Sequence, residues 1–171
     1  MSTLTIPTAR LNLVLQTPEE VLAWIDTLPP ADRAEVSPEW IARVRESKAG
    51  DPWALSYKMV ESSSGSVVGS CAFKGPPNAD GMVEIAYGVE PDFQRRGFAT
   101  EAAQALTDFA LTSGKVRVVR AHTKAENNAS ARVLTKCGFR SIGLVFEPED
   151  GVVMRWERNN SDPETSRADH C

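Results

Sequence analysis

Apolar and polar residues alternate along several short stretches of the chain, which is the two-residue period of a strand with one buried face. In the first such stretch, Leu11, Leu13 and Leu15 share one side. Residues 82–89 also alternate and end in a polar turn. Together with β-branched composition, this pattern predicts strands at residues 10–15, 53–60, 66–73, 82–89, 116–121, 139–146 and 152–156.

Helix signals separate these strands. Thr17-Pro18 reads as an N-cap followed by proline at the first helical position, and Ser37-Pro38 repeats the pattern. A longer run with helical spacing follows residue 97, and a shorter run begins at the asparagine pair 127–128. These signals predict helices at residues 18–26, from 38 onward, at 97–112 and at 127–137.

The order of the elements indicates the fold. A strand, two helices, three strands, a helix, a strand, a helix and two strands follow one another. This order predicts an α/β (α+β) fold in which helices flank a single mixed sheet. Because no repeat or linker divides the chain, we expect one domain over residues 1–158. Residues 159–171 are polar and aperiodic, and we expect a disordered tail there.

Composition narrows the class of protein. The 171 residues are 42% hydrophobic and 25% charged, which is typical of a globular domain. The net charge of −4 argues against a general nucleic-acid binder. No apolar run reaches the ~18 residues of a membrane span, and no secretory signal is visible. Three cysteines without a CxxC pair and only two histidines argue against a metal site and favour a reducing cytoplasm.

The turn between the strand at 82–89 and the long helix carries the clearest candidate chemistry. A glycine and a small alanine at the mouth of a helix direct several backbone N–H groups to one point, where the helix dipole adds positive potential. This predicts a phosphate or pyrophosphate site. Neither a Walker loop nor a G-x-G dinucleotide fingerprint is present. The residues expected to meet the phosphorylated ligand are Gln94, Arg95, Arg96, Gly97, Phe98, Ala99 and Thr100.

Three motifs together resemble the GNAT superfamily of acetyl-CoA-dependent N-acetyltransferases, most closely its RimJ/RimL-like branch. They are the Gln-x-x-Gly-x-Ala loop at 94–99, the Asn-x-x-Ser-x-Arg-Val-Leu-x-Lys-x-Gly-Phe run at 127–139, and Thr-x-Arg-Leu-x-Leu at 8–13. The resemblance covers residues 8–158. It implies a splayed mixed sheet, with acetyl-CoA as co-substrate between the strands at 82–89 and 116–121, and no metal.

Glu84 is the candidate general base. Strand alternation places it on one face with Ala86 and Gly88, whose small side chains leave room for a ligand. A carboxylate there could take a proton from an attacking amine, and the RimJ/RimL-like branch has a Glu at the matching position. The alternative is a solvated strand glutamate. Backbone amides near Gly88 and Val89 are expected to steady the oxyanion.

The short second helix carries the other implied roles. Asn127 matches the family residue that binds the pantetheine arm, and it also suits an N-cap. The family's usual acid, a tyrosine, is replaced by Leu134, so the resemblance makes Ser130 the candidate donor to the thiolate. His122 follows the predicted end of its strand, where it could face the acceptor site or water, and we favour water.

The sequence therefore predicts an N-acetyltransferase that transfers acetyl from acetyl-CoA to a primary amine by direct attack. The acceptor, a protein N-terminus or a small amine, stays open because the segments that shape its pocket carry no recognisable code. The alternative is a coenzyme A sensor or interaction module with the same fold and little catalysis. This alternative stays open because Leu134 replaces the usual tyrosine. The resemblance leaves a homodimer open, and we expect no nucleic-acid or membrane partner.

Overall fold

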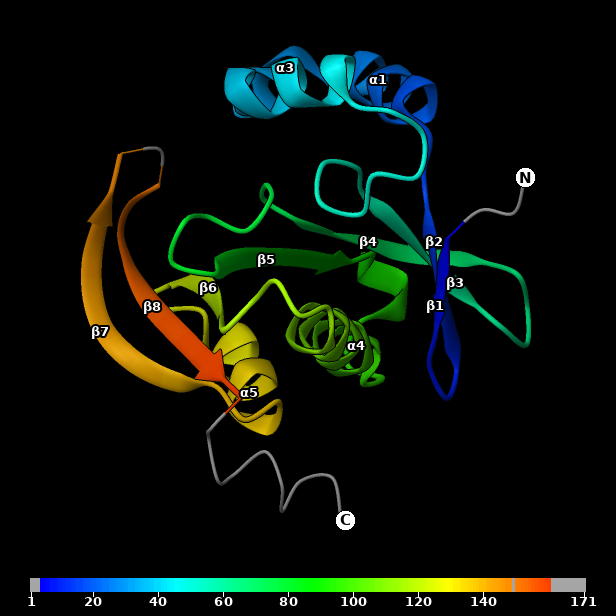
Figure 1. The fold of residues 1–171 in the computed structure, drawn as a ribbon. Helices are drawn as coiled ribbons and strands as arrows, with labels where there is room; N and C mark the ends of the chain where they lie inside the picture. Colours follow the sequence, from blue (N-terminus) through cyan, green and yellow to red (C-terminus); the bar gives the residue numbers. More distant parts are fainter. Residues whose placement is uncertain (1–3, 149, 161–171) are drawn as a thin grey trace.

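The structure, a computed structural model, describes residues 4–148 and 150–160. Its centre is an eight-stranded sheet with the order β1-β2-β3-β4-β5-β6-β8-β7 (Figure 1). The mixed sheet predicted from the sequence is confirmed. The strands are β1 (Thr5–Pro7), β2 (Leu11–Leu15), β3 (Tyr57–Glu61), β4 (Val67–Phe73), β5 (Met82–Val89), β6 (Val118–Lys124), β7 (Arg140–Glu147) and β8 (Gly151–Asn159).

One strand pair differs from all the others in the sheet. Neighbouring strands are antiparallel except β5 and β6, which are parallel and paired only from Met82–Val118 to Glu84–Arg120. β5 continues to Val89 without a partner on that side. The sheet therefore opens at its middle, and the last paired residue of β5 is Glu84.

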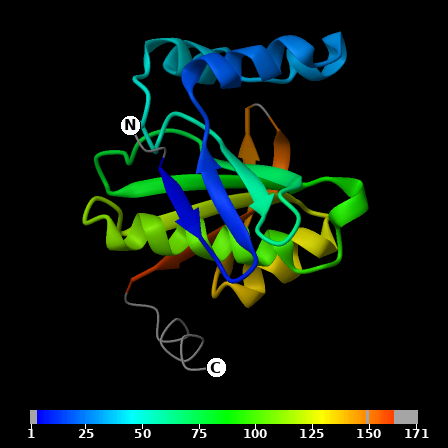
Figure 2. The ribbon, with the colours of Figure 1, turned by 90° about the vertical axis from the view of Figure 1, so that its right-hand side faces the viewer.

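Helices cover both faces of the sheet. α1 (Pro18–Thr27), α2 (Pro30–Ala34) and α3 (Pro38–Glu46) belong to one side, and α4 (Phe98–Thr112) and α5 (Asn128–Lys136) cover the other (Figures 1 and 2). The predicted N-caps form. Thr17 makes a reciprocal capping box with Glu20, and the Ser37 hydroxyl accepts a hydrogen bond from the Trp40 amide. No helix in the described ranges is long and apolar enough to span a membrane.

The main core lies between the sheet and α4. The inward leucines of β2 are 0–3% exposed, and they lie in one buried cluster with Phe98 and Leu106 of α4. Trp53, Phe73 and Phe109 add a group of rings with centroids 4.8–6.0 Å apart. Burial of this apolar surface is the main term that holds α4 against the sheet.

Predicted boundaries were wrong for two strands in the middle of the chain. The strand expected from Trp53 begins only at Tyr57, because the apolar run before it enters the core as irregular chain, with the Trp53 amide bonded to Asp51 Oδ1. The strand expected at 116–121 runs from Val118 to Lys124. In both places the apolar residues are buried, but the backbone that carries them does not pair in a sheet.

The ends of the chain also differ in part from the prediction. The short β1 and α2 were not predicted. β8 continues through Asn159, so this first residue of the predicted tail pairs in the sheet opposite Val118. Asn160 donates a side-chain hydrogen bond to the Leu111 carbonyl. The rest of the predicted tail, residues 161–171, lies outside the described residues.

Candidate active site

The opening between β5 and β6 exposes backbone groups of β5. The Glu90 amide donates to the Val68 carbonyl, and the Lys74 amide donates to the Glu84 carbonyl. Antiparallel ladders alternate, so the amide of Gly88 is directed at β4 and that of Val89 at the opening. Of the two amides expected to steady an oxyanion, only that of Val89 thus points to the opening.

The predicted phosphate turn has the geometry of an anion cradle. Arg95 and Gly97 both adopt left-handed backbone, with φ of +65° and +85°. Gly97 is the N-cap of α4 and offers no side chain to the first-turn amides of Phe98, Ala99 and Thr100. These donors stay available to an anion at the positive end of the helix.

The side chains of the turn have separate tasks. Phe98 is only 2% exposed and packs in the core, so its backbone alone can meet a ligand. The Gln94 amide group donates to the Val89 carbonyl at 3.0 Å and ties the turn back to β5. Arg95 and Arg96 are exposed, and Arg96 lies over the Phe93 ring. The positive charge of these arginines therefore stands at the surface of the turn.

A contact that we did not predict braces this turn. The Arg10 guanidinium donates to the Arg96 carbonyl at 2.7 Å, forms an ion pair with Glu101, and lies 4.5 Å from the Phe98 ring centre. Thr8 also donates to Glu101, at 2.7 Å. The Thr-x-Arg motif near the N-terminus thus holds the turn and the first turn of α4 together.

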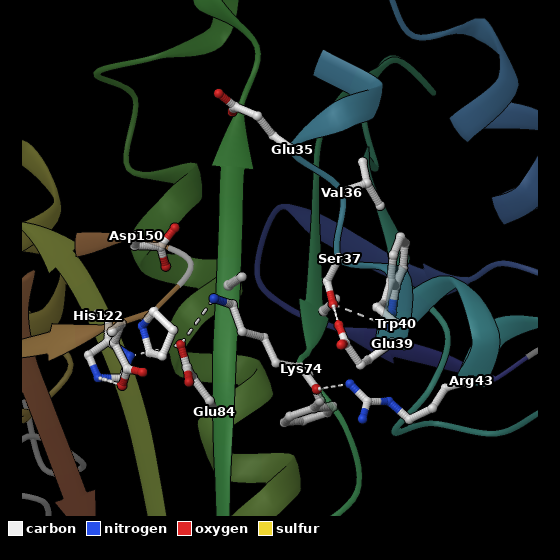
Figure 3. A pocket seen from close by; sticks show the side chains of 15 residues that line it. Glu35, Val36, Ser37, Glu39, Trp40, Arg43, Lys74, Glu84, His122 and Asp150 are labelled. Atoms are coloured by element: carbon white, nitrogen blue, oxygen red, sulfur yellow. Dashed lines mark hydrogen bonds and ion pairs between the residues drawn. The ribbon is translucent and has the colours of Figure 1, made fainter. Parts of the chain in front are cut away.

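Glu84 lies beside a cavity of about 640 Å³, on the face of the sheet under α3. Its side chain is 20% exposed, and the small Ala86 also lines the cavity, as strand alternation predicted. The carboxylate accepts from His122 Nδ1 at 2.9 Å and pairs with the ammonium of Lys74 at 3.2 Å (Figure 3). Glu84 is thus a half-buried, partnered carboxylate rather than a freely solvated one.

The expectation that His122 faces water was wrong. Its side chain is 5% exposed, because β6 continues past Ala121 and places His122 opposite Arg155 on β8. Arg155 Nε donates to His122 Nε2 at 3.1 Å, and its guanidinium also pairs with Glu147 at 3.0 Å. His122 Nε2 also lies 3.2 Å from Glu147 Oε1, so the ring stands between two carboxylates, with Nδ1 on Glu84.

The rim of the same cavity is rich in carboxylates. Glu35, Glu39 and Asp150 line it together with Glu84 (Figure 3), and Glu147 lines it as well. The cations that line it are already engaged: Lys74 with Glu84, and Arg43 with the Lys74 carbonyl at 2.9 Å. The cavity therefore presents an excess of negative charge to an incoming ligand.

The start of α5 lies on the other side of the sheet. Asn127 caps the helix, and its side-chain oxygen accepts from the Ser130 amide at 3.0 Å, so the predicted capping role is confirmed. Leu134, at the family's acid position, is 0% exposed. Burial raises the pKa of Tyr87 to about 12, and the side chain of Ser130, in the first turn of α5, acts to lower that pKa by a smaller amount.

Neither buried cysteine is arranged as a nucleophile or a metal ligand. Cys71 and Cys137 are free thiols, and burial raises the pKa of each to about 12. In the described part of the chain, no three His, Cys, Asp or Glu side chains gather as a metal site would require. Cys171 lies outside the described residues.

Known proteins resemble this chain in sequence and in fold. Residues 7–140 match the acetyltransferase (GNAT) domain family. An uncharacterized N-acetyltransferase YjdG of Bacillus subtilis is 31% identical over 65% of this chain and 66% of its own length, and an uncharacterized N-acetyltransferase p20 of Bacillus licheniformis is 29% identical over 56% and 54%. The chain therefore spans about half to two thirds of these curated relatives.

Two solved structures share the fold. RimL, a ribosomal L7/L12 alpha-N-protein acetyltransferase in complex with coenzyme A, is 19% identical, with a TM-score of 0.68 over 91% of this chain and 98% of its own. AAC(6')-Ib in complex with ribostamycin and coenzyme A is 16% identical, with a TM-score of 0.67 over 92% and 98%. The splayed sheet and the match over residues 7–140 together place this chain in the GNAT acetyltransferase family.

Proposed function

We propose that this protein transfers the acetyl group of acetyl-CoA to a primary amine held in the Glu84 cavity. One observation carries the proposal: the amide-lined turn before α4 and the Glu84 carboxylate both stand at the opening between β5 and β6, on opposite faces of the sheet. A donor that enters from one face can meet an acceptor from the other. The relatives named N-acetyltransferases support the reaction class.

The residues present fit acetyl-CoA. The amides from Arg95 to Thr100 suit a pyrophosphate, since they are donors at a helix N-terminus with no side-chain cap. Asn127, exposed at the start of α5, suits the pantetheine arm, and the Val89 amide suits the oxyanion. Coenzyme A in the related RimL and AAC(6')-Ib structures supports this donor.

Glu84 would act as the general base. An acceptor ammonium must lose a proton before it attacks a thioester, and a carboxylate at the cavity wall can accept that proton directly or through water. The contact of His122 Nδ1 holds the carboxylate in place, and Arg155 and Glu147 hold the ring from its other side. His122 and Arg155 are thus positioning residues for the base. The nitrogen then attacks the carbonyl carbon and gives its second proton to water, while the C–S bond breaks and the sulfur leaves with the electron pair as the coenzyme A thiolate. No covalent intermediate with the protein forms.

The charge of the cavity indicates which class of acceptor it can hold. A cavity rimmed by Glu35, Glu39 and Asp150 favours a ligand that carries an ammonium group, and it disfavours an acidic one. Both a protein N-terminus, as in the related RimL, and an aminoglycoside, as in AAC(6')-Ib, meet this description. We place the chain in the RimJ/RimL-like branch on the motif at residues 127–139.

A panel of acceptors tests the proposal. Small amines, polyamines, aminoglycosides and N-terminal peptides are incubated with acetyl-CoA, and acetylated products are detected by mass spectrometry. We expect turnover on at least one cationic amine and a loss of about 10²–10⁴-fold in kcat for Glu84→Gln. The control Glu126→Gln, an exposed carboxylate after β6, should keep full activity. Full activity of Glu84→Gln at every pH would contradict the base assignment.

One observation favours a second function. Leu134 removes the usual acid, which suits a coenzyme A sensor that binds the nucleotide without efficient catalysis. Calorimetric binding of acetyl-CoA with no product from any amine in the panel would support the sensor instead.

A further inference from the structure

The side chain of Tyr87 has an unusual environment. Its hydroxyl is buried, and no hydrogen bond of good geometry reaches it in the described part of the chain, although the Ser130 side chain lies near enough to act on its pKa. The other tyrosine is satisfied, because Tyr57 Oη donates to the Pro52 carbonyl at 3.1 Å. A buried hydroxyl without a partner has lost its hydrogen bonds to water with nothing in return, so such a group in a native protein calls for an explanation.

The position of Tyr87 suggests that a ligand supplies the partner. The residue lies three positions beyond Glu84, on the part of β5 that has lost β6 as a neighbour. Strand alternation directs its side chain to the face opposite Glu84. There it adjoins Ser130 of the first turn of α5 and Cys137 at the end of that helix. The phenol thus lies beside the open edge of β5, on the face that α5 covers, where a pantetheine thiol is expected to lie.

We propose that the Tyr87 hydroxyl, with Ser130 beside it, is the hydrogen-bond and proton donor to the departing thiolate. This inference rests on the proposed acetyl transfer. The C–N bond forms, the C–S bond breaks, and the sulfur keeps the electron pair and takes the phenolic proton. The proton of the amine goes to Glu84, and water later returns a proton to the phenolate. The acid function that Leu134 cannot supply is then supplied from the strand.

The chemistry of the buried phenol agrees with this role. Because its pKa is raised to about 12, Tyr87 keeps its proton at neutral pH and remains a donor. Ser130 alone is a much weaker acid, and its amide is already bound by Asn127. The pair can therefore share the sulfur, with the phenol giving the proton.

A binding experiment tests the proposal without turnover. Calorimetry compares coenzyme A with desulfo-coenzyme A, which lacks the thiol, for the wild type and for Tyr87→Phe. We expect the wild type to bind coenzyme A about tenfold more tightly than the desulfo analogue, a difference of about 1.4 kcal/mol. Tyr87→Phe should bind both equally, and the control Tyr57→Phe should keep the preference. Undiminished preference in Tyr87→Phe overturns the assignment.

A kinetic experiment separates chemistry from structure. With acetyl-CoA, Tyr87→Phe should lower kcat about 10–100-fold, the lower part of the range for acid catalysis, and leave KM unchanged. With phenyl thioacetate, whose leaving thiol is more acidic, the same variant should lose little, because that sulfur needs less help. Equal losses with both donors would assign Tyr87 a structural role. If the wild type acetylates no amine, the proposed function fails while the binding comparison still judges Tyr87.

A spectroscopic probe covers the case in which Tyr87→Phe does not fold. The chain has only two tyrosines, so 3-fluorotyrosine incorporated into Tyr57→Phe labels Tyr87 alone. We expect its ¹⁹F resonance to shift on addition of coenzyme A and to shift much less with the desulfo analogue. Identical shifts with the two ligands would mean that the hydroxyl does not contact the sulfur.

Discussion

Replacement of Arg10 should weaken acetyl-CoA binding more than it weakens the fold. Arg10 is far from the turn in sequence but joins three of its features: the Arg96 carbonyl, the Glu101 carboxylate and the Phe98 ring. A Cβ built on Gly97 would lie 3.1 Å from Arg10 Nη2, so the guanidinium fills the space under the turn. Arg10→Met removes both polar contacts and keeps part of the apolar stem.

The expected magnitude follows from exposure. The Arg10 side chain is 47% exposed and that of Glu101 21%, so the ion pair is screened and contributes about 0.2–1 kcal/mol. With the bond to the Arg96 carbonyl, a total near 1 kcal/mol lowers Tm by about 2–4 °C for a chain of this size. Without Arg10, binding of acetyl-CoA must also order the turn. If this ordering costs the same ~1 kcal/mol, KM for acetyl-CoA rises about fivefold.

Steady-state kinetics and thermal unfolding measure the two effects separately. For Arg10→Met we expect the higher KM for acetyl-CoA, an unchanged kcat and the small fall in Tm. Arg10→Lys keeps the charge but cannot reach both partners, so it should lie between the wild type and Arg10→Met. Arg45→Met, an exposed arginine near the end of α3, is the matched control and should change neither value. An unchanged KM for acetyl-CoA in Arg10→Met, with Tm lowered as expected, would refute the bracing role.

The Arg10–Glu101 contact should also make stability depend on pH. Partial burial acts to raise the pKa of Glu101, but hydrogen bonds from Thr8 and from the Arg10 backbone and guanidinium outweigh it and hold the pKa below its ordinary value. A depressed pKa means stability that is present above the unfolded value near 4.5 and is lost as pH falls through the folded value. Glu101→Gln should therefore unfold with a weaker acid dependence below pH ~4.5 than the wild type.

Three further predictions concern other parts of the site. A Cβ at Gly69 would lie 2.2 Å from a backbone oxygen of β5, so Gly69→Ala should lower the free energy of unfolding by about 1–3 kcal/mol, measured in urea. Lys74→Met removes the ammonium that occupies Glu84 and should lower KM for a cationic amine several-fold; a higher KM would mean that Lys74 orients the carboxylate. Cys71 and Cys137 should resist iodoacetamide at pH 8 until guanidinium is added, in a variant without the C-terminal cysteine. Because burial raises both thiol pKa values to about 12, stability should also fall between pH ~9 and 12; rapid native labelling would contradict this.

Helices and strands that are determined by neighbouring residues were predicted correctly from the sequence. The proline-marked caps of α1 and α3 formed because a hydroxyl before the first turn satisfies its amides wherever the helix packs. The strand at 82–89 was predicted with its observed bounds, because its alternation is bounded by turn residues on both sides. Its alternation also placed Glu84 with Ala86 beside the cavity.

Long-range contacts account for what was missed. The Arg10–Glu101 pair joins residues 91 positions apart, and no periodicity encodes it. For His122, the error was one of boundary: the predicted strand ended at Ala121, so the histidine was expected to face water. Three more residues of strand put it opposite Arg155 and next to Glu84. A short error in an element's end can therefore exchange a surface residue for one in the active site.

The position of the proposed base follows from the single parallel pair in the sheet. A parallel pair needs a crossover between its strands, and here α4 makes it, so the turn that begins α4 necessarily lies at the carboxyl end of β5. Pairing with β6 stops at Glu84, and from there to Val89 one edge of β5 is open. The crossover thus brings anion-binding amides to one side of the opening, and the end of pairing leaves a carboxylate and Tyr87 on its two faces. Lengthening the β5–β6 ladder would close this opening, so the unpaired edge is a requirement of the proposed site.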